Sequence, residues 1–332
     1  MVARDDDRYR VFDEFVYTPP GFEALLSPDG RYVARNGGLR SLTRAWSLTK
    51  VLPGPPADPL AFSPDGTRLV TTSAHGGRQV TDHVEVHRLD TDSRPLRIPV
   101  GTAWIAPGWT AALSADNATL ALQVGDEVWL VRLDAAAGLV PYRRMPLAGG
   151  RLAGPGSWRP DGGALMVAEP RGDGWRLTAL DTATGAPLAE PQFPELAAAT
   201  YVRIVGWRSA DTVVALVGIP ATGPTQTPGD VERAGGGFRE ENTTGVRLVE
   251  LHRGATKPET VLQTPPGISE LDVAADLAVA GAVRPAGDPS YGPPKQIFTV
   301  TGAGVLILIL LMVLAVFRLS RDRVVRRRST RG

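Results

Sequence analysis

A short unit recurs along the chain, and it restricts the fold more than any other sequence feature. Each copy has an apolar residue, a small or polar residue, a Pro/Ala-Asp-Gly/Asn triplet and then a short apolar run. The clear copies are LLSPDGRYVA (25–34), AFSPDGTRLV (61–70), ALSADNATLA (112–121) and SWRPDGGALM (157–166); weaker ones are GWRSADTVVAL (206–216) and LDVAADLAVAG (271–281). Their aspartates recur about every 49 residues. That spacing is typical of β-propeller blades made of four short strands.

The chemistry of the repeated Ser-Pro-Asp-Gly is that of a tight turn. Proline presets φ, aspartate accepts hydrogen bonds from nearby backbone N–H groups, and glycine accepts a positive φ. The apolar runs on either side are then predicted to be two antiparallel strands of one hairpin. We therefore interpret the repeat aspartates as turn residues rather than catalytic or metal-binding carboxylates: Asp29, Asp65, Asp116, Asp161, Asp211 and Asp276.

A second pattern follows several of these hairpins and predicts a further strand. It alternates apolar and polar residues in DHVEVHRLDT (82–91), DEVWLVRLD (126–134), GWRLTALDTATG (174–185) and GVRLVELHRG (245–254). Such alternation is expected of a half-buried strand. Before residue 297 the best helix signal is PELAAAT (194–200), which is scarcely two turns long. The sequence therefore predicts an all-β fold, a six-bladed or alternatively seven-bladed β-propeller of four-stranded antiparallel blades.

Together these two patterns resemble a known group. Ser-Pro-Asp-Gly with a strand, followed by a strand ending in Leu-Asp-Thr-x-x-Gly, resembles the WD40-like repeat of TolB-type β-propellers, here in a bacterial, membrane-anchored version. The resemblance covers about residues 20–283, without the Gly-His and Trp-Asp pairs of the standard WD40 repeat. It implies an interaction platform at the cell envelope. It also implies a ring closed by an N-terminal strand, for which YRVFDEFVY (9–17) is the candidate.

An uncharged apolar segment near the C-terminus predicts one transmembrane helix. Residues 297–317 read IFTVTGAGVLILILLMVLAVF, and about 20 apolar residues cross a hydrocarbon core of about 30 Å. A Gly/Pro-rich spacer precedes it at 284–296, and an arginine-rich tail follows at 318–332. The tail gives a membrane-proximal basic cluster of Arg318, Arg321, Arg323, Arg326, Arg327 and Arg328. We therefore expect a propeller over 1–283, with a flexible loop at 219–245, in a single-pass plasma-membrane protein with the lipid bilayer as a partner.

Two features of the sequence predict opposite orientations of that helix in the membrane. An arginine cluster normally marks the cytoplasmic side, which predicts a cytoplasmic tail and an extracytoplasmic propeller. The first residues, MVARDDDRYRVFDEF, contain no apolar core of a signal peptide, which favours a cytoplasmic propeller unless a leader precedes them. Both orientations stay open at this point.

Composition excludes several classes of function. The chain has no cysteine, so disulfides, thiol catalysis and thiolate metal sites are excluded. Its net charge of +1 comes from the arginine tail, which leaves the rest of the chain mildly acidic. Nucleic acid is not predicted as a partner, because phosphate binding needs a basic face. We expect a protein partner instead.

The best candidates for metal-ligand side chains lie together on one predicted strand. His83, Glu85 and His87 share one face, because side chains on a strand alternate. A His-x-His pair with a carboxylate is a weak candidate for a zinc site. The other interpretation is that all three face water while the valines between them face the core. No fourth ligand is evident, so we predict no metal and no cofactor. Trp104 and Trp109 are further candidates for lining a binding face.

Catalytic motifs are weaker still. The sequence has no Gly-x-Ser-x-Gly elbow, and the glycine run GGGFRE (235–240) is not followed by lysine. We therefore expect a non-catalytic platform for a protein or another ligand, with no catalytic residue. The alternative is a propeller enzyme, hydrolase-, lactonase- or lyase-like, with a metal in the central channel. That alternative requires acidic or histidine side chains pointing inward from several innermost strands.

Overall fold

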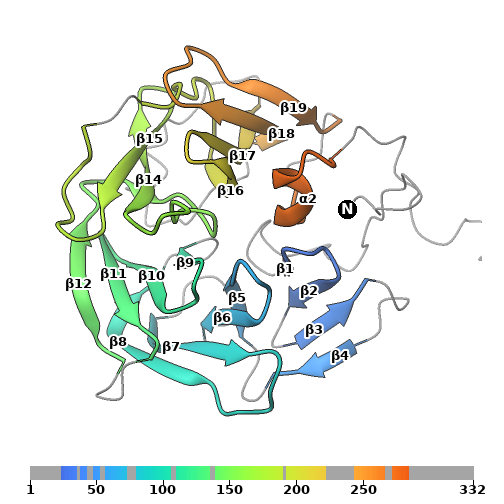
Figure 1. Cartoon of the computed structure of the whole chain (residues 1–332), viewed down its shortest axis with the longest axis vertical. Helices are drawn as coiled ribbons and strands as arrows, with labels where there is room; N and C mark the ends of the chain where they lie inside the picture. The colour runs from blue at the N-terminus through green and yellow to red at the C-terminus, as the bar shows by residue number, and fades with distance from the viewer. Residues whose placement is uncertain are drawn as a thin grey trace, which may run out of the picture. The chain divides into compact units, whose positions relative to one another are not determined.

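Five antiparallel β-sheets surround a common centre in the computed structural model (Figure 1). The structure describes residues 24–35, 38–42, 48–52, 57–72, 80–105, 110–134, 139–189, 192–221, 243–265 and 271–283. All of them belong to one compact unit, residues 17–285. A second unit, residues 1–16 and 286–332, lies outside the described residues.

Each sheet uses strands that follow one another along the chain. The first contains β1 (Ala24–Leu26), β2 (Tyr32–Arg35), β3 (Gly38–Ser41) and β4 (Leu48–Val51), and the second β5 (Asp58–Phe62), β6 (Arg68–Thr72), β7 (Val80–Arg88) and β8 (Leu96–Trp104). The third contains β9 (Ala111–Leu113), β10 (Thr119–Val124), β11 (Glu127–Arg132) and β12 (Pro141–Pro146). The fourth contains β13 (Arg151–Leu152), β14 (Ala164–Arg171) and β15 (Gly174–Asp181), and the fifth β16 (Val202–Ser209), β17 (Thr212–Pro220), β18 (Thr243–His252) and β19 (Glu259–Gln263).

These sheets are the blades of a β-propeller, as the sequence predicted. The first strand of a blade lies toward the centre and the last toward the outside, which is plain for β1, β5, β9 and β16 in Figure 1. The repeat forms the hairpin that opens a blade, for example β5 and β6 around the turn at Asp65. The alternating pattern forms the third strand, β7, β11, β15 or β18, in four of the blades.

The fifth copy of the repeat shows how the fold absorbs an irregular unit. It has one residue more before its aspartate than the clear copies have. The strand pair β16–β17 accommodates this by register shifts between Ile204 and Gly206 and between Trp207 and Ser209. Such β-bulges insert a residue without breaking the hairpin. The connection from β17 to β18 spans most of the predicted loop 219–245, of which residues 222–242 lie outside the described part.

The prediction of six or seven blades is wrong, because the described chain forms five. The sixth copy of the repeat, 271–281, contains the short helix α2 (Ala275–Val279) instead of a hairpin. This copy lacks the proline and glycine that make the turn, and it is rich in alanine, the strongest helix former. Asp276 therefore lies in the first turn of a helix rather than in a β-turn. The segment 194–200 is not helical; within it Leu196 forms an isolated bridge with Trp175.

The hydrophobic core lies between blades rather than in one central mass. One cluster joins the second and third blades, another the third and fourth, and another the fourth and fifth. Strands such as β14 are buried on both faces for this reason. A further cluster joins Leu25 of the first blade and Leu216 of the fifth with Val273 and Ala278 of the α2 segment, defined here as residues 271–283. That segment therefore connects the first and last described blades.

The predicted membrane anchor requires a correction. Residues 297–317, the spacer 284–296 and the arginine tail 318–332 all lie outside the described residues, as does the candidate closing strand 9–17. Among the residues that are described, no helix has the length and apolar character needed to cross a bilayer. The predicted single-pass plasma-membrane location is corrected on this finding and is not carried further. Contact with a lipid bilayer has no support in the described structure.

Candidate ligand-binding pocket

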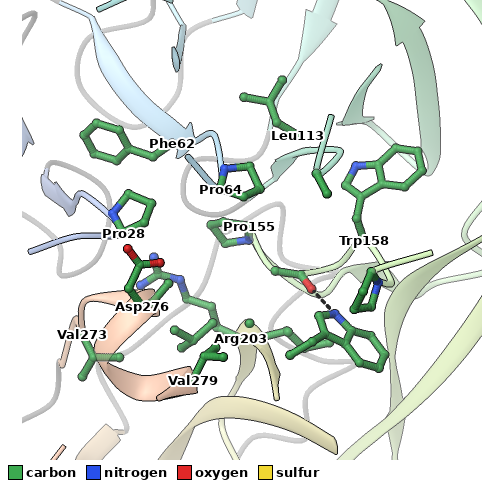
Figure 2. A pocket seen from close by; sticks show the side chains of 18 of the residues that line it. Pro28, Phe62, Pro64, Leu113, Pro155, Trp158, Arg203, Val273, Asp276 and Val279 are labelled. Atoms are coloured by element: carbon green, nitrogen blue, oxygen red, sulfur yellow. Dashed lines mark hydrogen bonds between the residues drawn. The ribbon is translucent and has the colours of Figure 1, made fainter. Parts of the chain in front are cut away.

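A cavity of about 430 Å³ lies where the innermost strands of the blades meet the α2 segment. Residues of β1, β5, β9 and β16, the stretch 155–160 that leads into β14, and residues 273–280 line it (Figure 2). All five described blades therefore contribute to one pocket. Its volume is within the range of small-molecule sites, about 300–1,000 Å³.

Equivalent positions of the repeat supply the apolar wall. The residue two places before the Pro/Ala of each clear copy, and its counterpart in the fifth copy, line the pocket: Leu26, Phe62, Leu113, Trp158 and Trp207. The Pro or Ala of each clear turn lines it as well: Pro28, Pro64, Ala115 and Pro160. The repeat thus builds a ring of turns and large apolar side chains, and Figure 2 shows several of them around the cavity.

Hydrogen bonds to the repeat aspartates hold the turns of this ring. In the second blade the Ser63 hydroxyl donates to Asp65 Oδ1 at 2.6 Å, and the Thr67 amide donates to the same oxygen at 3.0 Å. The Arg68 amide donates to Ser63 Oγ at 2.8 Å. The first and third blades repeat this network around Asp29 and Asp116. These contacts are those of turn residues, which is the role that the sequence predicted.

The same contacts set the acidity of these carboxyl groups. The Ser114 hydroxyl, followed by the Ala118 amide, lowers the pKa of Asp116. Burial alone would raise the pKa of Asp65, but hydrogen bonds from Ser63, Thr67 and Asn117 outweigh burial and lower it. In the fourth blade Arg159 replaces the serine, and its hydrogen bonds lower the pKa of Asp161. The turn aspartates with resolved shifts are therefore held as carboxylates.

Two tryptophans of the ring are fixed by hydrogen bonds between neighbouring blades. Trp158 Nε1 donates to the carbonyl of Ala112 in the third blade at 3.0 Å. Trp207 Nε1 donates to the carbonyl of Gly156, in the stretch leading into the fourth blade, at 2.8 Å. Buried indole N–H groups normally find such a partner. The two bonds set the positions of the indole rings in the pocket wall.

The cationic side chains of the pocket are already paired with carboxylates. Arg203 Nη1 lies 2.8 Å from Asp272 Oδ1, and Arg159 forms an ion pair with Asp161. Asp272 Oδ2 also accepts the Leu26 amide at 2.7 Å. Because these arginines are neutralised, the pocket has no excess positive charge.

Asp276 differs from every other charged residue of the pocket. Among the described residues its carboxylate forms no hydrogen bond and no ion pair, although its backbone amide donates to the Pro28 carbonyl at 3.0 Å. Burial, followed by repulsion from Asp29, raises the pKa of Asp276. Figure 2 shows the carboxylate beside Pro28. The pocket therefore combines an apolar wall with one unpaired carboxylate.

Close packing positions the α2 segment against the fifth blade. A Cβ atom on Gly206 would come within 2.8 Å of Val279 Cγ2, so a larger residue there would force Val279 to shift. Arg208 Nε donates to the Val279 carbonyl at 3.1 Å, and Arg208 Nη1 lies 2.8 Å from Glu250 Oε1. These contacts fix the helix that carries Asp276.

The histidines and glutamate of β7 lie together, away from this pocket. Glu85 Oε1 is 3.5 Å from His83 Nε2, and Glu85 Oε2 is 3.3 Å from His87 Nε2. Glu85 and His87 are only 5% and 3% exposed, so the interpretation that all three face water is wrong. Arg97 Nε donates to Glu85 Oε1 at 2.9 Å. Within the described residues, no group of three or more acidic, histidine or cysteine side chains has the arrangement of a metal site.

The remaining predicted residues fall outside what the structure describes. The side chain of Trp104, Trp109 and the basic cluster from Arg318 to Arg328 are not described. The sequence reasoning missed Arg203, Asp272 and the unpaired state of Asp276. Trp158 and Trp207, which precede the turn aspartates of their copies, pack against the hydrophobic core and also line the pocket. Their recurrence at one position of the repeat was the available signal for the pocket.

Comparison with known proteins finds similar folds only. No protein-family model matches the chain, and no curated protein matches it significantly. The hydrazine synthase of Kuenenia stuttgartiensis is similar over 77% of this chain and 69% of that chain, with 16% identity and a TM-score of 0.45. A putative TolB from Agrobacterium tumefaciens covers 75% of this chain and 83% of its own, with 16% identity and a TM-score of 0.47.

A third similar structure is the β-propeller domain of Cps50 (Swd1) from Myceliophteria thermophila. It covers 76% of this chain and 74% of its own, with 14% identity and a TM-score of 0.43. The similar structures thus include a TolB protein and a β-propeller domain. At these identities the likeness concerns the fold, and it carries no argument about ligand or activity.

Proposed function

We propose that this β-propeller is a non-catalytic binding module whose central pocket takes the apolar part of a ligand. The observation that carries the proposal is the convergence of equivalent repeat residues on one cavity. Each described blade presents one large apolar side chain there, and turns fixed by hydrogen bonds surround them. A mostly apolar, preformed pocket with few polar groups is the usual form of a ligand site.

The enzyme alternative has less support from the same residues. It needs several acidic or histidine side chains that point inward from different innermost strands. The described pocket residues include one carboxylate, Asp276, and no histidine. That donor set is poor for a catalytic metal, which normally has three protein ligands.

A substitution at the pocket rim tests the binding role. Ala115 is exposed at the tip of its turn and lines the pocket, so Ala115→Trp should fill the cavity without disturbing the core. The matched control is Ala183→Trp, at an exposed alanine of a turn that does not line the pocket. The probe is N-phenylnaphthylamine, a neutral molecule whose fluorescence rises in apolar surroundings.

The wild type and the Ala183→Trp variant should bind the probe with the same affinity, and Ala115→Trp should bind it at least tenfold more weakly. At probe concentrations well below the dissociation constant, this is a loss of about 90% of the fluorescence gain. Equal binding by all three proteins would place the probe elsewhere and contradict the proposal. Metal-dependent hydrolysis of an ester or lactone that Ala115→Trp abolishes would favour the enzyme alternative instead.

A further inference from the structure

The charged side chains of the pocket indicate which class of ligand it binds. Three charged side chains line it: Arg203, which pairs with Asp272; Arg159, which pairs with Asp161; and Asp276. After these pairings are counted, a single carboxylate is left without a partner among the described residues. An apolar pocket with one such group is complementary to a ligand of opposite charge.

We infer that the ligand is a small organic cation, an amine or guanidinium carried on an apolar or aromatic body, and that its charged group binds Asp276. This inference rests on the proposed function, because it names the ligand class of the same pocket. The apolar body lies against the ring residues, which include Phe62 and Trp158. A cavity of about 430 Å³ suits a small molecule better than a folded partner segment.

The electrostatic situation of Asp276 supports the assignment. Partial burial and the neighbouring Asp29 both disfavour its ionised form, so the pKa of Asp276 is raised. Asp29 is already engaged by Ser27, by the Arg31 amide and by Arg31 Nε at 3.6 Å. A bound cation would relieve the repulsion from Asp29, and it can reach the carboxylate because Asp276 is exposed. An anionic ligand would increase both penalties.

The aromatic wall supports it independently. Cations are attracted to the faces of tryptophan, tyrosine and phenylalanine rings, most strongly to tryptophan. Trp158 and Trp207 both line the pocket, and their N–H groups are occupied by backbone carbonyls. Neither indole therefore offers a free donor to an anion, while both rings are held in the wall. The two indole N–H groups therefore give no preference for an anionic ligand.

Three probes with the same phenethyl body test the inference with the full chain by titration calorimetry. Phenethylamine is a cation at neutral pH, phenethyl alcohol is neutral and hydrocinnamate is an anion. We expect phenethylamine to bind about tenfold tighter than the alcohol, because its ammonium adds an opposite charge to the hydrogen bond with the carboxylate. A factor of ten is about 1.4 kcal/mol. Hydrocinnamate should bind more weakly than the alcohol.

Variants assign that preference to one residue. Asp276→Asn should reduce the affinity for phenethylamine to that for phenethyl alcohol and leave the alcohol unchanged. Asp126→Asn, which removes an exposed carboxylate in the β10–β11 turn, should change neither affinity. If Asp276→Asn keeps the tenfold preference, the inference is overturned.

The remaining outcomes separate the two proposals. Equal binding of the amine and the alcohol would overturn the inference of a cationic ligand but would leave the proposed binding function intact. No binding of any probe, together with no binding of N-phenylnaphthylamine, would overturn both. If N-acetyl-phenylalanyl-lysine amide binds at least tenfold tighter than phenethylamine, the ligand is a protein segment and the small-molecule assignment fails.

Discussion

Arg203 of β16 and Asp272 of the α2 segment form an ion pair, with 2.8 Å between Nη1 and Oδ1. The Arg203 side chain is only 7% exposed, and that of Asp272 is 25% exposed. The second Asp272 oxygen accepts the amide of Leu26 in β1, 246 residues away in the sequence. One carboxylate thus joins the first described blade, the fifth blade and the α2 segment at the wall of the pocket.

The first prediction concerns this carboxylate. Asp272→Asn removes the partner of a nearly buried guanidinium, and breaking one side of such a pair costs about 3 kcal/mol. We expect a lower free energy of unfolding by about that amount in urea titrations. The double variant with Arg203→Met and Asp272→Leu should recover part of the loss, because it leaves no unpaired charge. An effect of Asp272→Asn below about 0.5 kcal/mol, the size of a surface substitution, would contradict the role of this contact.

The second prediction concerns the bond between the fourth and fifth blades. Trp207→Phe keeps an aromatic ring but removes the N–H donor to the Gly156 carbonyl. Loss of one partner of a hydrogen bond in such a place costs about 1–3 kcal/mol. We expect a corresponding loss of unfolding free energy, and a similar loss for Trp158→Phe, whose N–H donates to Ala112. An unchanged midpoint in both variants would show that these bonds do not hold the blades together.

Local chemistry explains which parts of this fold could be predicted from the sequence. A Ser-Pro-Asp-Gly turn is specified by neighbouring residues, and Asp65 makes its contacts with Ser63 and Thr67. The hairpins and the third strands of the blades could therefore be predicted from the sequence. The sixth copy kept its aspartate, Asp276, but lost the proline and glycine, and alanine-rich sequence turned it into α2. Counting aspartates alone thus gave one blade too many.

Contacts between blades explain what could not be predicted. The alternation in β7 correctly placed His83, Glu85 and His87 on one face, but it could not show what covers that face. Leu69 pairs with His87 and packs in a cluster with Leu39 of the first blade, so the face is turned toward that blade. The pocket has the same origin, because its residues come together only when the blades form a ring. Period-two patterns carry no information about either arrangement.

The third prediction tests the burial of Glu85. Its carboxylate contacts Arg97, His83 and His87, and it is 5% exposed. Glu85→Gln keeps the shape but removes the charge, and we expect a loss of about 2 kcal/mol in unfolding free energy. The matched control is Glu169→Gln, whose pair with Arg176 is more exposed and should cost less than 1 kcal/mol. Equal losses would mean that Glu85 behaves as a surface carboxylate.

The fourth prediction is a pH dependence at a repeat turn. Hydrogen bonds from the Ser114 hydroxyl and the Ala118 amide lower the pKa of Asp116 below its ordinary value. A lowered folded pKa stabilises the protein above the unfolded pKa, and this stability is lost as the pH falls through the folded pKa. Asp116→Asn should therefore cost about 0.5 kcal/mol at pH 7, a small value because the turn is exposed. The cost should vanish in strong acid, and urea titrations that show the same cost at both pH values would refute this prediction.

The fifth prediction has the opposite sign and concerns Asp276. Burial, followed by the charge of Asp29, raises the pKa of Asp276, so ionisation of this group costs folding free energy. That cost is present above the folded pKa and disappears as the pH falls below the unfolded pKa. Asp276→Asn should therefore stabilise the ligand-free protein at neutral pH, by about 0.5 kcal/mol at most because the side chain is exposed and solvent screens its charge, and the gain should shrink in acid. Calorimetric melting of the wild type and the variant at neutral and acidic pH measures this directly. Destabilisation at neutral pH would mean that the carboxylate has a stabilising partner, and Asp276 could then no longer be the free group that binds a cation.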